Sequence, residues 1–213
     1  MATIGSVMEL PSAEEVAEGL ARVLELLRRR TGHDFHRYRR QTIQRRVRHR
    51  LLCCQQPGME DYLRLLESDP REPEALVQDL LISVTSFFRD PEAFAYLAEH
   101  VLPRLLHDKG PEEPLRIWVP GCATGEEAYT LAMLVQEKLA GLASPPPVQI
   151  FATDIDREAL QEARQGRFEA GLVEALSPER LGAFFVGDGR VYQVASRLRE
   201  ICVFSAHNLI RDP

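Results

Sequence analysis

Residues 119–127, Val-Pro-Gly-Cys-Ala-Thr-Gly-Glu-Glu, decide the fold expected for this chain. A short apolar run over 115–119 predicts a buried strand, and helical spacing of apolar residues over 126–139 predicts a helix. Between them, Gly121 and Gly125 let the backbone approach a ligand closely and place a helix N-terminus against it. The stretch is neither a G-x-G-x-x-G pattern nor a P-loop, since no lysine follows Gly125.

A second strand and helix follow this loop. Residues 148–153 predict a strand and 156–165 a helix, with Asp154 at the tip of the strand. An acid at the end of the second strand of such a sheet commonly binds both hydroxyls of a ribose. A third strand is predicted over 201–204. Because strands and helices alternate, the sequence predicts an α/β fold with a parallel, Rossmann-like sheet.

Two carboxylates, Glu126 and Glu127, occupy the place where a pyrophosphate would otherwise lie. Two negative charges there repel phosphate and favour a cationic ligand such as a sulfonium. A simpler interpretation is that both acids only complement the dipole of the helix that they begin. Combined with the glycines and Asp154, however, the pair favours a nucleoside ligand that carries a positive charge.

The chain before the sheet is predicted to be helical. A helix begins at Ser12, which has capping-box spacing to Glu15. The further helices expected are 38–52, 61–67, 72–82 and 90–107, the last with Phe94, Leu97, Val101 and Leu105 on its inner face. We therefore expect a tail or linker over 1–10, a helical domain over 11–90 and the sheet domain over 91–213.

The charge of this chain is unevenly distributed. The 213 residues carry a net charge of −6, yet residues 35–59 hold seven arginines and no acid, so this window carries +7. In the helix predicted over 38–52, apolar residues recur on one face, and Arg45 and Arg48 lie on the opposite face. A solvated helix face and a docking face for an acidic partner are both compatible with this pattern.

Several classes of protein are disfavoured by composition. No stretch approaches 18 apolar residues, and the first ten residues do not resemble a secretory signal. Four cysteines, two of them adjacent, form neither a disulfide framework nor a metal-ligand pattern. The net negative charge argues against general affinity for nucleic acid or anionic lipid. We therefore expect a cytoplasmic protein with no membrane insertion and no metal site.

Four segments, in order, resemble the CheR-type chemoreceptor glutamate methyltransferases, which use S-adenosylmethionine. They are Ser-Val-Thr-Ser-Phe-Phe-Arg-Asp (83–90), Gly-Cys-Ala-Thr-Gly-Glu-Glu-Ala-Tyr (121–129), Phe-Ala-Thr-Asp-Ile-Asp (151–156) and Phe-Ser-Ala-His-Asn-Leu (204–209). The resemblance implies an all-helical receptor-recognition domain followed by a Rossmann-like methyltransferase domain. It also implies a small antiparallel β-subdomain inserted at about 167–199, where 177–185 predicts a short helix and 190–194 a strand.

The same resemblance implies roles for individual residues. Arg89, assigned to catalysis, and Thr85 would contact the methionine end of the cofactor, and Glu127 would meet its amino group. Ser83 stands where the family often has Asn. The full set expected to bind the cofactor is Ser83, Thr85, Arg89, Gly121, Gly125, Glu126, Glu127, Asp154, Asn208 and Leu209, with Asn208 and Leu209 beside the adenine. Arg45 and Arg48 match the positions of the family that contact the receptor.

The implied reaction converts a glutamate side chain of a chemoreceptor to its methyl ester and leaves S-adenosylhomocysteine. The partner would be the helical cytoplasmic domain of the receptor, and fusion to sensor or signalling domains is compatible with the sequence. The family continues into a strand with an Arg-Asn segment and a Tyr, so the chain is expected to lack part of the cofactor wall. Two alternatives stay open: a cofactor-binding regulatory module without catalysis, and a nucleic-acid methyltransferase whose basic helix binds phosphates.

Some members of the family also tether themselves to a pentapeptide at the receptor's C-terminus, through the β-subdomain and a longer glycine-containing loop. Here the corresponding turn, residues 186–190, contains Asp-Gly, which predicts a tight two-residue hairpin. So short a turn leaves little loop to form the wall of a peptide groove. We therefore expect no tethering.

Overall fold

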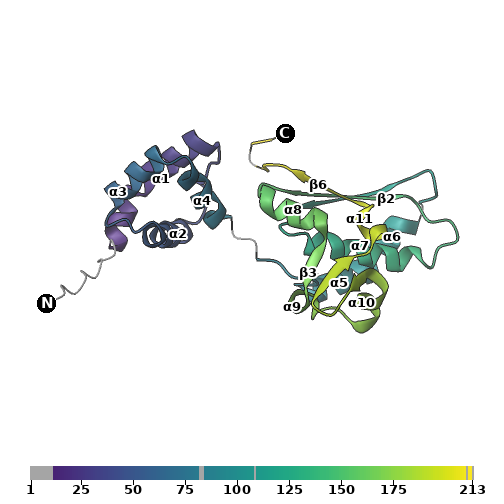
Figure 1. Cartoon of the computed structure of the whole chain (residues 1–213). Helices are drawn as coiled ribbons and strands as arrows, with labels where there is room; N and C mark the ends of the chain where they lie inside the picture. The colour runs from purple at the N-terminus through teal and green to yellow at the C-terminus, as the bar shows by residue number, and fades with distance from the viewer. Residues whose placement is uncertain (1–11, 82–83, 108, 210, 213) are drawn as a thin grey trace. The chain divides into compact units, whose positions relative to one another are not determined.

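The computed structural model describes residues 12–81, 84–107, 109–209 and 211–212. The chain divides into two compact units, residues 1–82 and 83–213 (Figure 1). The division falls several residues before the expected boundary at 90/91. The reason is Phe87, whose ring packs edge-on against Phe168 at 4.9 Å and Phe185 at 5.6 Å between ring centroids, in the core of the second unit.

In its described part, the first unit is built from helices α1 (Ala13–Thr31), α2 (Arg40–Cys53), α3 (Met59–Ser68) and α4 (Arg71–Leu80). The predicted capping box is confirmed: the Ser12 hydroxyl accepts from the Glu15 N–H, and the Glu15 carboxylate accepts from the Ser12 N–H. Gly32, with φ at 77°, ends α1 in the left-handed conformation. Among the described helices, none is both long enough and apolar enough to cross a bilayer.

An apolar core joins these helices, and one ion pair is buried beside it. The predicted stripe of α2 is confirmed, because Ile43, Val47 and Leu51 are all buried. They pack in one cluster with the stripe of α1 and with buried residues of α3 and α4. The core residues of α1 and their partners are Val16, Leu20, Val23, Leu24, Leu26, Leu27, Phe35, Met59, Tyr62, Leu63, Leu66, Leu76, Val77 and Leu80.

The buried ion pair joins Arg50 of α2 to Glu72 of α4. The guanidinium donates two hydrogen bonds to the two carboxylate oxygens, at 2.9 and 2.6 Å. Tyr62 and Cys54 donate to the same carboxylate, at 2.8 and 3.2 Å. Burial alone would raise the pKa of Glu72, but these hydrogen bonds outweigh it and hold the pKa below its usual value. Arg50 therefore belongs to the internal structure of this unit.

The second unit begins with a helix that changes its pitch. Segments α5 (Pro91–Tyr96), η1 (Leu97–Val101) and α6 (Leu102–His107) are continuous, and η1 is a π-helical turn. The inner face predicted for this helix is wrong in its second half: Leu102 and Leu106 are buried, whereas Leu105 is 46% exposed. A π-turn adds a residue to one turn of the helix, so the buried face moves by one position beyond it.

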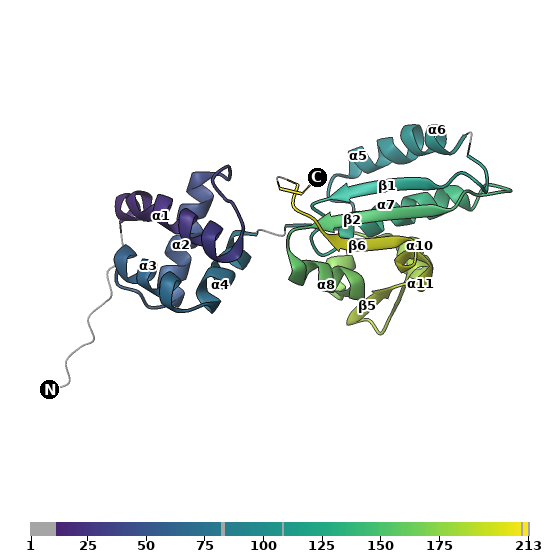
Figure 2. The same cartoon turned by 90° about the horizontal axis from the view of Figure 1, so that it is seen from above.

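The sheet contains β1 (Leu115–Pro120), β2 (Val148–Asp154) and β6 (Cys202–Ala206) in the order β1-β2-β6, all parallel. Helix α7 (Glu126–Leu139) has the predicted bounds, and α8 (Arg157–Gln165) follows β2. Figure 1 shows the helices of this unit on one side of the strands, and Figure 2 shows β2 between β1 and β6. On the other face Trp118 and Val203 are exposed, so the described residues cover one face of the sheet.

A small antiparallel sheet lies between α8 and β6, as expected. It has the order β3-β5-β4 and consists of β3 (Arg167–Glu169), β5 (Val191–Val194) and β4 (Phe185–Gly187), accompanied by α9 (Ala170–Val173), α10 (Pro178–Phe184) and α11 (Ser196–Arg199). The two-residue hairpin turn is wrong, because three residues separate β4 from β5. Within this loop the Asp188 carboxylate accepts hydrogen bonds from the N–H groups of Arg190 and Val191.

Candidate functional site

The carboxyl ends of the three parallel strands meet along one edge of the sheet. Pro120 pairs with Thr153, and Asp154 pairs with Ala206. Two backbone bonds extend this contact beyond the strands: Cys122 N–H donates to Thr153 O at 3.0 Å, and His207 N–H to Asp154 O at 2.9 Å. The loop after β1, the acid at the end of β2 and the segment after β6 therefore lie together, where open α/β sheets bind their ligands.

The two glycines of the loop after β1 have different roles in the structure. Both have positive φ, 69° at Gly121 and 97° at Gly125. A Cβ at Gly121 would meet no atom within 4 Å, so this glycine borders open space. A Cβ at Gly125 would lie 3.0 Å from Ala163 Cβ of α8. Gly121 thus suits close approach of a ligand, whereas Gly125 permits close packing of α7 on α8.

Asp154 is held in place by the backbone of the loops on either side of it. Its Oδ2 accepts from Ala123 N–H at 2.8 Å, and its Oδ1 accepts from Asp156 N–H at 2.9 Å. Ala123 reaches this position with φ at 46°, a left-handed conformation that the sequence did not predict. Each carboxylate oxygen has a further lone pair, so Asp154 can also accept hydrogen bonds from a pair of ligand hydroxyls.

The adjacent acids that begin α7 have opposite surroundings. Glu126 is 2% exposed and accepts a hydrogen bond from the Thr124 hydroxyl at 2.6 Å. Its burial raises the pKa of the carboxyl above the usual value. Glu127 is exposed to solvent in the same helical turn. Glu127 is therefore the accessible carboxylate of the pair and the one placed to meet a cationic group.

The segment before α5 is anchored beside the start of α7. Phe88 N–H donates to the Thr130 hydroxyl at 3.3 Å, and that hydroxyl donates to the carbonyl of Glu126 at 2.7 Å. Phe88 adopts a φ of 50° there, and Phe87 is buried in the core of the second unit. Thr85, half-buried, lies in the same segment.

Arg89 closes this segment on itself. Its Nη1 donates to the carbonyl of Val84 at 2.5 Å, and the side chain is exposed. The contact ties the guanidinium to the backbone next to Thr85, which the resemblance also assigns to the methionine end of the cofactor. Ser83 lies outside the described residues, so the structure gives no position for it.

The segment after β6 forms a turn at the same edge of the sheet. Asn208 N–H donates to the Asp212 carboxylate at 2.8 Å, and the Asn208 carbonyl accepts from the N–H groups of Arg211 and Asp212. Leu209 is 58% exposed and available for an apolar contact.

Sequence reasoning missed two aromatic residues at this edge. Trp118 Nε1 donates to the Thr153 hydroxyl at 3.0 Å, and the Trp118 ring lies edge-on to His207, with the centroids 5.9 Å apart. Alternation along the strand over 115–119 could have placed Trp118 on the outer face.

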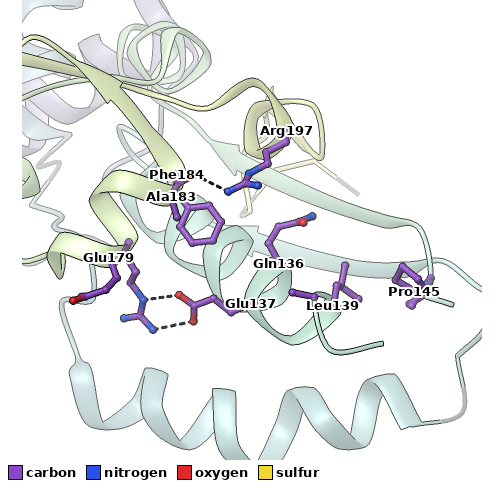
Figure 3. Close-up of a pocket in the computed structure, with 11 residues that line it drawn as sticks. Gln136, Glu137, Leu139, Pro145, Glu179, Ala183, Phe184 and Arg197 are labelled. Carbon is purple, nitrogen blue, oxygen red and sulfur yellow. Dashed lines mark hydrogen bonds and ion pairs between the residues drawn. The ribbon is translucent and has the colours of Figure 1, made fainter. Parts of the chain in front are cut away.

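A hollow of about 690 Å³ lies elsewhere in the second unit (Figure 3). Its lining includes Gln136 and Leu139 from the C-terminal end of α7 and Pro145 from the loop before β2. The loop before β2 lies at the amino end of the strand, so this hollow belongs to the sheet edge opposite to Asp154. The candidate site is therefore defined by the strand ends and not by this hollow.

In the first unit, α2 presents the predicted basic face. Arg45 is exposed and Arg48 half-buried, whereas Ile43 and Val47 point into the core. Arg45 and Arg48 therefore differ from Arg50 of the same helix, which binds Glu72.

Family models match nearly the whole chain. The description "CheR methyltransferase, SAM binding domain" matches residues 83–213, and "CheR methyltransferase, all-alpha domain" matches residues 18–81. The chain belongs to the CheR methyltransferase family. The boundary between the two matched domains coincides with the boundary between the two structural units.

Individual relatives agree with this family. Chemotaxis protein methyltransferase 2 of Pseudomonas aeruginosa is 32% identical over 197 residues, which are 91% of this chain and 68% of the relative. Chemotaxis protein methyltransferase of Salmonella typhimurium is 32% identical over 198 residues, 89% of this chain and 65% of the relative. An uncharacterised 104.1 kDa protein of Rhodobacter capsulatus is 40% identical over 199 residues, 93% of this chain. The chain spans 21% of that protein and about two thirds of the two methyltransferases.

The residues at the sheet edge fit S-adenosylmethionine, the cofactor of this domain family. Asp154 has acceptor capacity for ribose hydroxyls, and Glu127 presents an accessible negative charge for a cationic group. Gly121 adds open space beside the loop. Buried Glu126 is bonded to Thr124, so the structure gives it a role in shaping the start of α7.

Proposed function

We propose that this chain is the methyltransferase part of a protein that methylates glutamate side chains of chemoreceptors. One observation carries the proposal: the loop of Gly121, the backbone-held Asp154 and the accessible Glu127 converge at the carboxyl edge of a parallel sheet. Membership of the CheR methyltransferase family supports the reaction class. No contact of the residues that the structure describes favours nucleic acid as the substrate or a regulatory role without catalysis.

The cofactor would be held by its two ends and by its ribose. Asp154 would accept from the ribose hydroxyls, and Glu127 would bind the amino group of the methionine part. Asn208 and Leu209 would contact the adenine, Leu209 through its exposed side chain. The remaining residues proposed to contact the cofactor are Ser83, Thr85, Arg89 and Gly121. Gly125 and Glu126, which the resemblance also assigns to this site, would shape the loop and the start of α7 instead.

Methyl transfer to a glutamate carboxylate requires no general base from the protein. S-adenosylmethionine supplies a methyl group on a positively charged sulfur, and a glutamate side chain with an ordinary pKa is ionised near neutral pH and is already the nucleophile. The task of the chain is to hold donor and acceptor in line and to exclude water while their charges neutralise. Arg89, fixed by Val84, would orient the methionine end next to the reacting group.

The substrate would be recognised by the first unit. Arg45 lies on the side of α2 opposite to its buried stripe, and half-buried Arg48 lies beside the stripe, on a helix with no acidic residue. Such a face complements an acidic helical surface by charge. We propose that this face of α2 binds the cytoplasmic helical domain of a chemoreceptor. The protein would then act in the cytoplasm. Fusion to sensor or signalling domains stays a prediction.

The test combines cofactor binding with methyl transfer in the full-length protein. Calorimetry measures affinity for S-adenosylhomocysteine, and transfer of labelled methyl from S-adenosylmethionine to a receptor cytoplasmic domain measures activity. Glu127→Gln is expected to weaken binding, because it removes a charged hydrogen-bond partner. Glu158→Gln is the matched control, since Glu158 is also exposed in the first turn of a helix, α8.

Each outcome has a distinct meaning. Binding and transfer that both fall with Glu127→Gln, but not with Glu158→Gln, support the proposal. Tight binding without transfer to any receptor would instead indicate a regulatory module. Methyl transfer to DNA or RNA and not to receptors would overturn the substrate that we propose.

A further inference from the structure

Two consecutive phenylalanines before α5 contact the β-subdomain, which runs from β3 to α11. The ring of Phe87 packs edge-on against one ring of β3 and one of β4. The ring of Phe88 lies under the guanidinium of Arg180 from α10, whose Cζ is 4.3 Å from the ring centroid. This distance is typical of a cation–π interaction. The segment proposed to meet the methionine end of the cofactor is therefore attached to the β-subdomain through both rings.

Arg180 is itself oriented by an ion pair with α7. Its Nε and Nη2 donate to the two carboxylate oxygens of Glu137, at 2.7 and 3.0 Å (Figure 3). A two-point contact of this kind fixes the plane of a guanidinium. The two side chains are 31% and 33% exposed, and partial burial strengthens the attraction of a cation to an aromatic face. Arg180 thus places an oriented positive charge over the Phe88 ring.

The backbone of Phe88 needs such support. Its φ of 50° is left-handed, which is unfavourable for a bulky side chain and persists where the surroundings enforce it. The contacts that do so are the hydrogen bond from its N–H to Thr130, the edge-on packing of its ring on Phe94 with 5.7 Å between centroids, and Arg180. Because Arg89 comes next in the chain, the conformation of Phe88 sets the direction in which Arg89 starts.

We propose that Arg180 is a positioning residue for the methionine end of the cofactor. It holds Phe88 in the left-handed conformation and thereby keeps Thr85 and Arg89 where they can contact that end of S-adenosylmethionine. Arg180 lines the hollow at the other edge of the sheet, so it acts through the segment and not by touching the cofactor. The proposal rests on the roles proposed for Thr85 and Arg89, but not on the proposed receptor substrate.

Arg197 of α11 offers a matched comparison. Its Cζ lies 5.0 Å from the ring centroid of Phe184, and its Nη2 donates to the carbonyl of Ala183 at 2.6 Å. Like Arg180, it lines the hollow (Figure 3). Phe184, however, belongs to α10 and not to the segment before α5. Loss of Arg197 should therefore weaken packing within the β-subdomain without affecting the cofactor.

Calorimetry with two ligands tests the proposal on the full-length protein. S-adenosylhomocysteine has the amino-acid end, whereas 5′-methylthioadenosine keeps the adenine and the ribose but lacks that end. Arg180→Gln is expected to weaken the binding of S-adenosylhomocysteine at least about threefold, the size of a lost cation–π contact, and to leave that of 5′-methylthioadenosine unchanged. Arg180→Lys, which keeps a cation for the ring, should recover part of the loss. Arg197→Gln should change neither affinity.

A double-mutant cycle tests whether Arg180 acts through Phe88. Phe88→Leu keeps an apolar side chain but removes the aromatic face. In that background, Arg180→Gln should cause no further loss of affinity for S-adenosylhomocysteine. Native-state hydrogen exchange adds a second measurement, because residues 84–90 should exchange faster in Arg180→Gln but not in Arg197→Gln.

The outcomes against the proposal are distinct. Unchanged affinity for S-adenosylhomocysteine in Arg180→Gln would overturn it. Equal losses for both ligands, or equal effects of Arg180→Gln and Arg197→Gln, would show that Arg180 supports the fold in general, and would overturn it too. Both measurements are made without a receptor, so failure of the protein to methylate receptors would refute the proposed function alone.

Discussion

Helix α2 and the loop between β1 and α7 both carry residues proposed to act, but they hold them in different ways. On α2, the buried Ile43 and Val47 fix the helix, and Arg45 points away from them. In the loop, positions are set by positive φ angles and by backbone hydrogen bonds to Asp154. The surface residues of α2 are therefore separable from folding, whereas the loop residues combine folding with binding. The changes below test this difference.

The largest effect is expected at Glu72, which pairs with Arg50, an α2 residue that belongs to the internal structure and not to the surface. Glu72→Ala removes the main partner of the Arg50 guanidinium, which is 18% exposed and keeps a weaker acidic partner in Asp79, 3.9 Å away. The loss is therefore expected at the lower end of the range for buried pairs, about 3 kcal/mol. Denaturant unfolding of the first unit measures this loss. Glu74→Ala is the control, because Glu74 is exposed on the same helix. Equal effects of both changes would contradict the role of the buried pair.

Acid should reproduce part of this loss in the unchanged protein. The pKa of Glu72 is lower in the folded unit than its usual value of 4.5. Its contribution to stability is therefore complete well above pH 4.5 and is lost as the pH falls through the folded-state pKa. Unfolding measured as a function of pH should show this acid-dependent part, and it should be missing from Glu72→Ala.

The next largest effect is expected at Gly125. Gly125→Ala forces an alanine into a φ of 97° and brings its Cβ to 3.0 Å from Ala163 Cβ. The strained backbone costs about 1–3 kcal/mol, and the crowding adds to it. Thermal unfolding of the second unit should show the loss. A double-mutant cycle with Ala163→Gly, whose own cost inside α8 is measured separately, should isolate the part due to crowding against the Ala163 methyl group.

Gly121→Ala is the matched comparison. The open space beside Gly121 removes the steric part, so a smaller destabilisation is expected. Its added methyl group projects toward the space proposed for the cofactor, so affinity for S-adenosylhomocysteine should fall. If Gly121→Ala destabilised the unit as much as Gly125→Ala, the different roles of the two glycines would be wrong.

The sequence predicted those parts of the fold that depend on periodicity. The strand before Gly121, the helix α7 and the capped start of α1 each follow from a pattern that is complete within a short stretch of sequence. The inner face of α6 could not be predicted, because the π-turn at Leu97–Val101 has no marker in the periodicity of apolar residues. Strands β3 and β4 have three residues each, too few to show alternation.

The candidate site was predictable as a set of residues but not as an arrangement. Glu126 and Glu127 are chemically identical neighbours, and only the packing of α7 decides that one is buried and the other accessible. Likewise, nothing in the identity of Ala123 indicates a left-handed conformation, which arises because its N–H reaches Asp154. Burial and backbone conformation depend on contacts between distant segments, and a local pattern does not encode them.

A change at Asp154 is expected to lower stability less than Gly125→Ala does, but to weaken the binding of S-adenosylhomocysteine strongly. Asp154→Ala removes the acceptor for Ala123 N–H and the proposed acceptor for the ribose hydroxyls. Loss of such charged hydrogen bonds costs about 1.5–3 kcal/mol of binding free energy. Calorimetry with S-adenosylhomocysteine checks the result, with circular dichroism as the control for folding. Unchanged affinity would show that Asp154 does not bind the ribose.

Reversal of the surface charge on α2 should leave stability almost unchanged. Arg45→Glu with Arg48→Glu is expected to weaken receptor methylation while affinity for S-adenosylhomocysteine is retained. Arg64→Glu with Arg71→Glu is the control, because it changes the net charge equally at exposed positions of α3 and α4. Equal loss of methylation and cofactor affinity in the α2 variant would show that the helix supports the second unit's site.

The smallest effect is expected from the β-subdomain, where we predict no binding of a receptor C-terminal pentapeptide. An added peptide strand needs main-chain partners along an open edge. Strand β4 is at an edge of its sheet but spans only Phe185–Gly187, and the three-residue loop after it is closed by Asp188. So short an edge offers few hydrogen bonds, and this loop is too small to wall a groove. Calorimetric titration of the pentapeptide into the full-length protein should give no heat of binding at micromolar concentration. Micromolar affinity would show that the protein recruits the receptor through this peptide, and the charge reversal on α2 would then slow methylation without abolishing it.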